Sequence, residues 1–275
     1  MSYADDLLAV IAAETSSDKA LLLERIGPPS ERASWTLDAL PSRPGRAVGM
    51  TEAAEPPRRR RSLAHAPSRA RFLHAIHHIE LSAIDLATLL CLRASGAPAD
   101  LHRDFLAIAR EEAVHAGLLE SWLNAHACPP GTFPIHHKLW DAALAARDLG
   151  EQLVVVPRYL EARGLDVSAE LAPRLSAIDA EAGAIIERIY RDEIRHVAIG
   201  TRWHAWWCAE YRLDPCAHFA DTVRWHFSGQ LPSAFALDRA GRQQAGFSAS
   251  ELAVLEQPAP EGRRSGVPVE SPAGG

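Results

Sequence analysis

The chain has 275 residues, of which 47% are hydrophobic and 23% charged, and its formal net charge at pH 7 is −6. A chain of this size can bury a sizeable core, and its negative charge excludes a general polyanion-binding protein. The four cysteines form no Cys-x-x-Cys pair and the amino terminus begins with an acidic pattern, so we expect a cytoplasmic protein without a signal peptide. No apolar run reaches the roughly 18 residues of a membrane span.

Residues 1–66 are expected to form an irregular arm with short helices at Asp5–Ala13 and Lys19–Ile26, because four prolines follow these stretches. Arg58–Arg61 form a run of four arginines. The default interpretation of this run is a solvated segment or a contact with an acidic surface, and the alternative is contact with RNA or another polyanion.

Residues 67–212 predict four long helices, bounded by capping residues and by Gly and Pro stops. The expected bounds are Ser68–Ala94, Pro98–Ala125, Leu139–Arg163 and Pro173–Tyr211. The first and last links are short and the middle link is longer, which favours two hairpins in an antiparallel four-helix bundle. Residues 213–256 are expected to add helices at Cys216–Phe227 and Ala234–Gln244, and the Pro-, Gly- and Ser-rich tail 257–275 is expected to be disordered. No alternation predicts a sheet, so the expected class is all-α.

Two Glu-x-x-His motifs lie on the second and fourth predicted helices, and each follows a single glutamate at the same distance of 32 residues. Residues at i and i+3 share one helix face. Four carboxylates and two imidazoles from four helices make the ligand set of a di-iron or di-manganese bundle. The candidate metal ligands, which also form the candidate catalytic centre, are Glu80, Glu112, His115, Glu161, Glu193 and His196.

The charges of this set explain its composition. Two divalent metals carry +4 and four carboxylates carry −4, so the buried site is nearly neutral. Without a thiolate, and with one imidazole per metal, the set favours two iron ions, with two manganese ions or a mixed pair as alternatives.

Several neighbours of the motifs have competing interpretations. We expect Glu111 to face solvent, because it points about 100° away from Glu112. Asp192 is a candidate to orient an imidazole of a neighbouring helix. Asp85 has the same status as Asp192, and Glu187 is expected to support the ligands or lie on the surface. For His77 a packed or partly exposed ring is the default and a position facing the site the alternative. For Tyr159 and Tyr190 packing is the default and radical chemistry the alternative.

Three tryptophans and one proline near the motifs also have two interpretations each. Trp203, Trp206 and Trp207 follow the second motif at helical spacing, where core packing is the default and a substrate wall or an electron path the alternative. Pro157 should kink the third helix. Such a kink could widen the bundle for a substrate or simply be tolerated.

The segments HHIELSAIDL, AREEAVHAGLLESWL, YLEARGLDV and YRDEIRHVAIGTRWH resemble the ferritin-like di-iron carboxylate superfamily over about residues 68–212. They are most similar to an uncharacterised ferritin-like family, a domain of unknown function. LEARGLDV and DEIRH are also similar to segments of the tRNA-hydroxylating di-iron monooxygenase MiaE. The resemblance implies a ferritin-like bundle and the same six ligands, but not a substrate.

The leading functional expectation is an O₂-activating non-haem di-iron oxidoreductase, a monooxygenase or oxidase of an organic substrate. No nucleotide-binding glycine motif is visible, so its electrons should come from an external ferredoxin or reductase. The substrate could be a small molecule or a modified nucleoside. The alternatives are a di-manganese catalase, ferritin-type iron handling, and a metal-free helical interaction domain.

Overall fold

In a computed structural model the chain folds into helices, and the structure describes all residues except 1, 38, 48–49, 54–61, 228–234 and 257–275. The expected all-α class is confirmed. Extended pairing among the described residues is limited to an isolated bridge between Glu52 and Ile135. The Arg58–Arg61 run and the tail from residue 257 lie outside the described residues.

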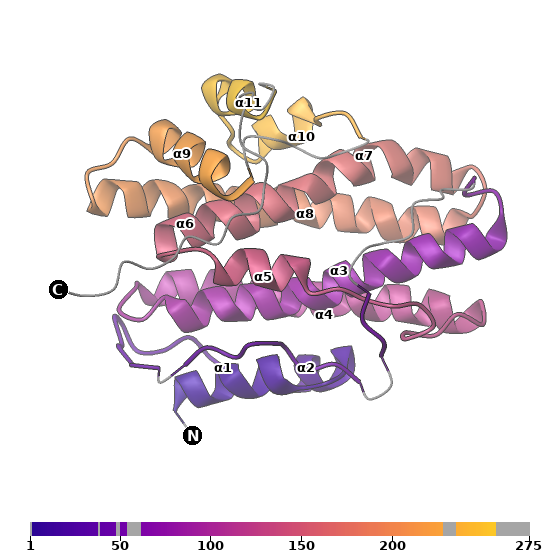
Figure 1. Cartoon of the computed structure of the whole chain (residues 1–275), viewed down its shortest axis with the longest axis horizontal. Helices are drawn as coiled ribbons and strands as arrows, with labels where there is room; N and C mark the ends of the chain where they lie inside the picture. Colours follow the sequence, from indigo (N-terminus) through magenta and orange to yellow (C-terminus); the bar gives the residue numbers. More distant parts are fainter. Residues whose placement is uncertain (1, 38, 48–49, 54–61, 228–234, 257–275) are drawn as a thin grey trace.

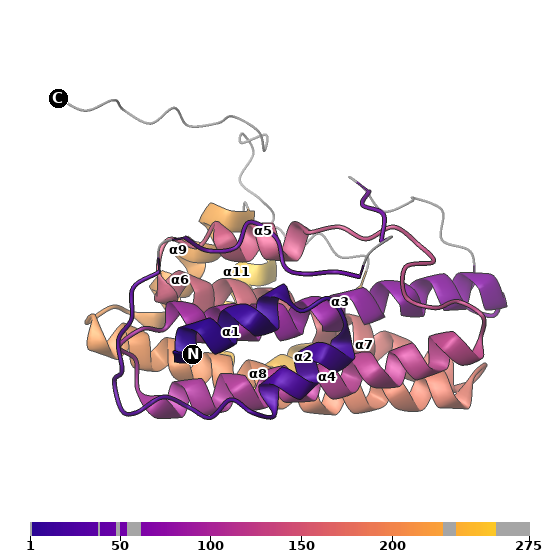
Figure 2. The ribbon, with the colours of Figure 1, turned by 90° about the horizontal axis from the view of Figure 1, so that it is seen from below.

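Four long helical segments lie side by side in the centre of the molecule (Figures 1 and 2). Helix α3 packs on α4, α7 packs on α8, and α4 packs on α8. Helix α3 is long and apolar enough to cross a membrane, but 83% of its apolar stretch is buried against the rest of the chain. It therefore serves as a core helix here. The four segments are α3 (Ala66–Arg93), α4 (Ala99–Ala125), the continuous run of α6 (Leu149–Leu153), the π-helix η1 (Val154–Glu161) and α7 (Ala162–Ser176), and α8 (Ala180–Glu210).

The third segment differs from its predicted bounds. A separate helix, α5 (Lys138–Leu144), occupies the predicted start. The segment then continues through Gly164, where a helix end was predicted, and this glycine lies beside the Glu193 side chain, since a Cβ there would be 3.9 Å from its carboxyl carbon. Helix α8 begins after Asp179, whose side chain accepts a hydrogen bond from the Ala182 amide, and not at the predicted proline.

The amino-terminal arm contains α1 (Tyr3–Ala12) and α2 (Ser16–Leu23), which pack on α3 and α4. A buried charge cluster joins the arm to α3. Asp85 is fully buried, and its two oxygens lie 2.7 Å from Lys19 Nζ and 2.7 Å from Arg46 Nη1. Asp85 therefore holds the arm and does not face the candidate ligands.

A buried histidine gives this junction a pH dependence. His102 Nε2 lies 3.2 Å from the Ala94 carbonyl and Nδ1 lies 3.2 Å from the Tyr3 hydroxyl, so the neutral ring satisfies both partners. Burial lowers the pKa of His102 to about 4. The unfolded chain then binds more protons between pH 6.5 and 4, and stability falls as the pH falls through this window by about 1.4 kcal/mol per pH unit.

We expect His102→Gln, which cannot titrate, to lack this loss. Urea unfolding of both proteins at pH 6 and pH 5 measures the difference. Equal slopes of stability against pH in the two proteins would contradict the prediction.

The carboxy-terminal extension, α9 (Pro215–Phe227), α10 (Arg239–Gln244) and α11 (Ala249–Glu256), covers η1, α7 and α8 (Figure 1). Helix α10 is shorter than predicted, and α11 was not predicted. Two buried ion pairs fix the extension, Arg158 with Glu251 at 2.8 Å and Arg242 with Asp166 at 2.8 Å. Arg158 and Asp166 lie three residues before and five residues after Glu161, so these pairs hold the chain on both sides of that glutamate.

Candidate metal centre

The six predicted ligands come from the four long segments and point into one buried region. Their side chains lie in the interior between the helices, where the exposed fraction of each residue is at most 8%. They come from α3 (Glu80), α4 (Glu112 and His115), the end of η1 (Glu161) and α8 (Glu193 and His196).

Glu112 lies at the centre of this group. Its Oε2 is 3.2 Å from His115 Nδ1, and its Oε1 is 2.8 Å from His196 Nδ1. Each imidazole also approaches a second carboxylate, at 3.3 Å for Glu80 and 3.9 Å for Glu193. The atoms form two groups that share Glu112, and within each group all ligand atoms lie within 4.8 Å of one another. A carboxylate with one oxygen in each group is suited to bridge two cations.

Glu161 is less closely placed than the other five. It is absent from both tight groups among the described residues. Its carboxyl is nevertheless buried and near enough to Glu112 and His196 for their charges to act on its pKa. The structure therefore brings five predicted ligands into direct contact and places the sixth at the edge of the same region.

Several buried polar atoms of this group lack a hydrogen bond within the described part of the chain. A buried acceptor without a partner costs roughly 1–3 kcal/mol, and more when it is charged. Orphaned oxygens and a ring nitrogen that face the same interior are what a cation would satisfy, so the residues fit a metal centre. The atoms are Oε2 of Glu161 and of Glu193, together with Oε2 of Glu80, Oε1 of Glu112 and Nδ1 of His196, which lie close to an oppositely charged partner but without hydrogen-bond geometry.

The surroundings of three buried carboxylates in this group favour their protonated, neutral forms. Burial, assisted by the charge of Glu112, raises the pKa of both Glu80 and Glu161 to about 8, and it raises that of Glu193 well above its usual value. Burial opposes the charged form of His115, but the contacts with the carboxylates of Glu112 and Glu80 outweigh it and raise the pKa to about 12. Burial likewise opposes ionisation of Glu112, but the two histidines lower its pKa.

The outer nitrogens of both imidazoles contact carboxylates on the opposite helix. His115 Nε2 lies 3.0 Å from Asp192 Oδ2, and His196 Nε2 lies 2.6 Å from Glu111 Oε2. The contact of Asp192 agrees with its predicted orienting role. The solvent-facing interpretation of Glu111 is wrong, because its side chain reaches across to His196 on α8. Both acids directly precede a motif glutamate, and this shared position is the sequence signal for the role of Glu111.

Neutralising these acids should weaken metal binding without abolishing it. We expect Glu111→Gln or Asp192→Asn to reduce metal affinity about 10–100-fold, because the imidazole loses the acceptor that fixes its ring and its proton. Competition with a chelator of known affinity measures the change. Glu187→Gln, at an exposed position on α8, is the control. Unchanged affinity in both variants would contradict the orienting role.

The π-helix η1 ends at Glu161 and spans the position of the predicted kink. Pro157 lies inside it and cannot donate a backbone hydrogen bond. Helix α8 approaches closely here, since a Cβ at Gly200 would lie 2.4 Å from Pro157 Cβ. Gly200 and Pro157 are each four residues from a candidate ligand, so this contact sets how near η1 and α8 come at the centre.

The other neighbours of the motifs have partners away from the centre. His77 Nε2 lies 3.9 Å from Glu120, and the Tyr190 hydroxyl donates to Asp238 at 2.7 Å. Tyr159 is buried and stacks on Phe227, with ring centroids 3.6 Å apart. These contacts agree with the default packing interpretation.

Another cluster, His204, Cys208 and His218, has the residue types of a metal site and was not anticipated. Arg158, which can only donate, lies 2.8 Å from His204 Nδ1. The neutral ring therefore carries its proton on Nε2, which lies 2.9 Å from His218 Nδ1. The cluster is better described as a hydrogen-bonded chain than as a cation site.

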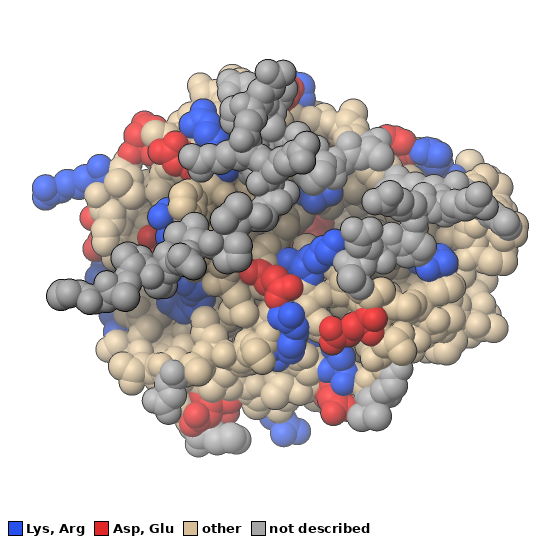
Figure 3. Space-filling view, in the orientation of Figure 1, with Lys and Arg blue, Asp and Glu red and all other residues tan. Residues whose placement is uncertain are grey.

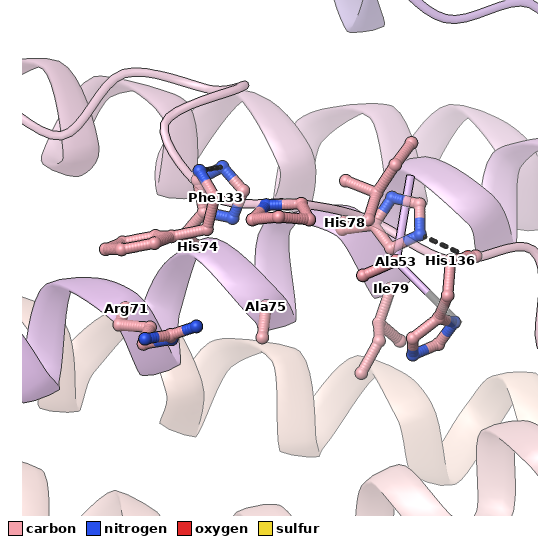
Figure 4. Close-up of a pocket in the computed structure, with 10 residues that line it drawn as sticks. Ala53, Arg71, His74, Ala75, His78, Ile79, Phe133 and His136 are labelled. Carbon is pink, nitrogen blue, oxygen red and sulfur yellow. Dashed lines mark hydrogen bonds between the residues drawn. The ribbon is translucent and has the colours of Figure 1, made fainter. Parts of the chain in front are cut away.

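A pocket on α3 is lined by Arg71, His74 and His78 together with the loop residues Phe133 and His136 (Figure 4). The helical residues of the pocket share one face of α3, and Glu80 falls on the opposite face at 100° per residue. This pocket therefore does not open beside the candidate metal centre.

Comparison with known proteins identifies relatives of unknown function. The family model described as "Protein of unknown function (DUF455)" matches residues 6–253. An uncharacterized protein of Haemophilus influenzae is 35% identical over 202 residues, which cover 70% of this chain and 69% of that protein. No solved structure matches the chain.

Proposed function

The chain belongs to the DUF455 family, and we propose that it is a non-haem di-iron oxidoreductase that activates O₂ to hydroxylate or oxidise an organic substrate. The observation that carries this proposal is the set of buried, mutually facing carboxylates and imidazoles with orphaned oxygens on four helices. We further propose that the four segments form a ferritin-like antiparallel bundle, an arrangement that the paired motifs and the packing of α3, α4, α7 and α8 support.

The residues divide into distinct roles. Glu112 would bridge the two ions, Glu80 with His115 would complete one site, and Glu161 with Glu193 and His196 would complete the other. Two ferrous ions bound there would supply electrons to O₂. Glu111 and Asp192 would hold the outer imidazole protons, so that Nδ1 of each ring faces the metal.

The burial of the candidate ligands favours redox chemistry in a site with little access to bulk water. The residues of the centre are at most 8% exposed, so water access is limited. The ligand set contains carboxylate and imidazole but no thiolate, which suits iron or manganese. Catalytic turnover would need an external donor such as a ferredoxin or a reductase.

The distribution of charge on the surface favours a small substrate over a long polyanion. The face shown in Figure 3 has acidic and basic side chains interspersed over the part that the structure describes. Together with the net charge of −6, this pattern favours a small molecule or a modified nucleoside as substrate.

Stopped-flow spectroscopy of the anaerobically Fe(II)-loaded protein mixed with O₂ tests the proposal. We expect a transient charge-transfer band followed by a stable diferric product that stays bound to the protein. Release of mineralised iron would favour ferritin-type iron handling. No reaction with O₂, together with rapid peroxide breakdown by the manganese form, would favour a catalase. A protein that binds neither metal would be left as a helical interaction domain.

A further inference from the structure

Four aromatic side chains form a continuous row along the carboxy-terminal half of α8. The ring centroids of Trp203 and Trp206 are 5.5 Å apart, those of Trp206 and Trp207 are 6.3 Å apart, and those of Trp207 and Tyr211 are 4.2 Å apart. Each ring is therefore close to the next, and the row runs from the interior to the end of the helix.

The inner end of the row lies between the two helices that carry the Glu-x-x-His motifs. Trp203 is 8% exposed and follows His196 by seven residues, a rise of about 10.5 Å along α8. Its hydrogen-bond partner Asp104 likewise lies seven residues before Glu111 on α4, so both helices place the indole about two turns from the candidate metal centre. Ile108 of α4 and Ile199 of α8 belong to the same buried core as Trp203.

A carboxylate accompanies the inner indole. Trp203 Nε1 donates to Asp104 Oδ2 at 2.8 Å, from α8 across to α4. Arg202 pairs with the same Asp104 oxygen, and its guanidinium carbon lies 5.5 Å from the Trp203 ring centroid, so the charges beside the indole offset each other. The hydrogen bond satisfies the buried indole N–H and fixes the ring between α4 and α8.

The outer end of the row reaches solvent. Tyr211 is 57% exposed and ends α8. The neighbouring Trp207 lies directly on the backbone of Gly150, where a Cβ would come 2.1 Å from the indole nitrogen. The glycine leaves the space that Trp207 needs to reach Tyr211.

We propose that Trp203, Trp206, Trp207 and Tyr211 form an electron-transfer row that carries oxidising equivalents from the metal centre to the surface. The proposal rests on the proposed di-iron function, with O₂ as the oxidant. One electron leaves Trp203 for the oxidised centre and is replaced in turn from Trp206, Trp207 and Tyr211. Tyr211 then loses its phenolic proton to water. A thiol or an ascorbate-type reductant restores it by returning one electron and one proton.

When no substrate is bound, this route would let electrons from the surface reduce the oxidised metal centre. The buried ligands would then be spared from oxidation. The route also gives the exposed tyrosine the chemistry to oxidise a partner molecule by one electron. Both outcomes use the same transfers and the same residues.

The first experiment uses the metal-free full-length chain in a Trp225→Phe background, which removes an exposed tryptophan outside the row. A flash-generated ruthenium tris-bipyridine oxidant oxidises indole, and transient absorption follows the decay of the indole radical as Tyr211 is oxidised to the tyrosyl radical. We expect Trp207→Phe to slow this transfer at least about tenfold. Trp140→Phe, at a buried ring whose Nε1 has no hydrogen-bond partner among the described residues, is the control. Equal transfer rates in both variants would overturn the row.

The second experiment uses the Fe(II)-loaded protein frozen at intervals after mixing with O₂, and electron paramagnetic resonance detects protein radicals. We expect Trp203→Phe to lose the Tyr211 radical while the diferric absorbance still forms. The same radical in Trp203→Phe, or a wild-type centre that oxidises without any radical, would overturn the row and leave the proposed function standing. A protein that binds no iron would overturn the proposed function, and the flash measurement would then decide whether the row transfers electrons.

Discussion

Replacing Glu112 with alanine is expected to abolish stoichiometric metal binding, with a loss of affinity of more than about 100-fold, beyond the range typical of residues that only orient a ligand. Glu112 differs from the other five candidates because its two oxygens face different imidazoles, at 3.2 Å and 2.8 Å. Its removal therefore damages both sites at once. Elemental analysis of protein purified without chelators, expressed as ions per chain, measures the effect.

Two comparisons sharpen this experiment. Glu187→Ala removes an exposed carboxylate from α8 and should keep two ions per chain. Glu80→Ala removes a contact to His115 alone, so it should affect one site more than the other. Full loading of Glu112→Ala would show that the centre is not built around this residue.

Replacing Asp85 with alanine is expected to destabilise the folded chain by about 3–5 kcal/mol. The change leaves Lys19 and Arg46 buried without the carboxylate that neutralises both of them. Because Lys19 is fully buried, it cannot recover its hydration unless the arm separates from α3. Urea unfolding at constant pH measures the loss of stability.

An exposed ion pair provides the control. Asp141 pairs with Arg43, and about half of each side chain is exposed. Asp141→Ala should therefore cost less than about 1 kcal/mol. A similar small cost for Asp85→Ala would mean that the buried pairs do not hold the arm. The double variant Lys19→Met with Asp85→Leu should recover part of the stability, because it removes charges from both sides of the contact.

The candidate metal centre could be predicted because its residues recur at regular spacings in the sequence. Two i, i+3 pairs and two single glutamates at equal spacing specify one helix face each, and helical geometry then brings these faces together. The structure differs from the prediction that Glu111 faces solvent, for a related reason. The 100° step correctly places it off the Glu112 face, but it ignores the neighbouring helix, whose His196 lies in the direction that Glu111 takes.

The third segment was harder to predict because tertiary contacts override local signals there. Gly164 is typical of a helix end, but α7 continues through it alongside the Glu193 side chain. Pro157 predicts a local distortion of the helix, and the chain forms a π-helix over Val154–Glu161 at this place. The buried ion pair between Lys19 and Asp85 joins residues that are 66 positions apart, and no local sequence pattern indicates such a pair.

The two ion pairs of the carboxy-terminal extension impose an order on biosynthesis. Glu80, Glu112 and His115 leave the ribosome early, and they can meet as soon as α3 and α4 form their hairpin. The helix that carries Glu161 gains its flanking partners, Arg242 and Glu251, only after a further 81 and 90 residues have been translated. On the proposed function, the nascent chain would therefore present the half of the metal centre on α3 and α4 first, and the half that contains Glu161 would become fixed only after the extension has been translated.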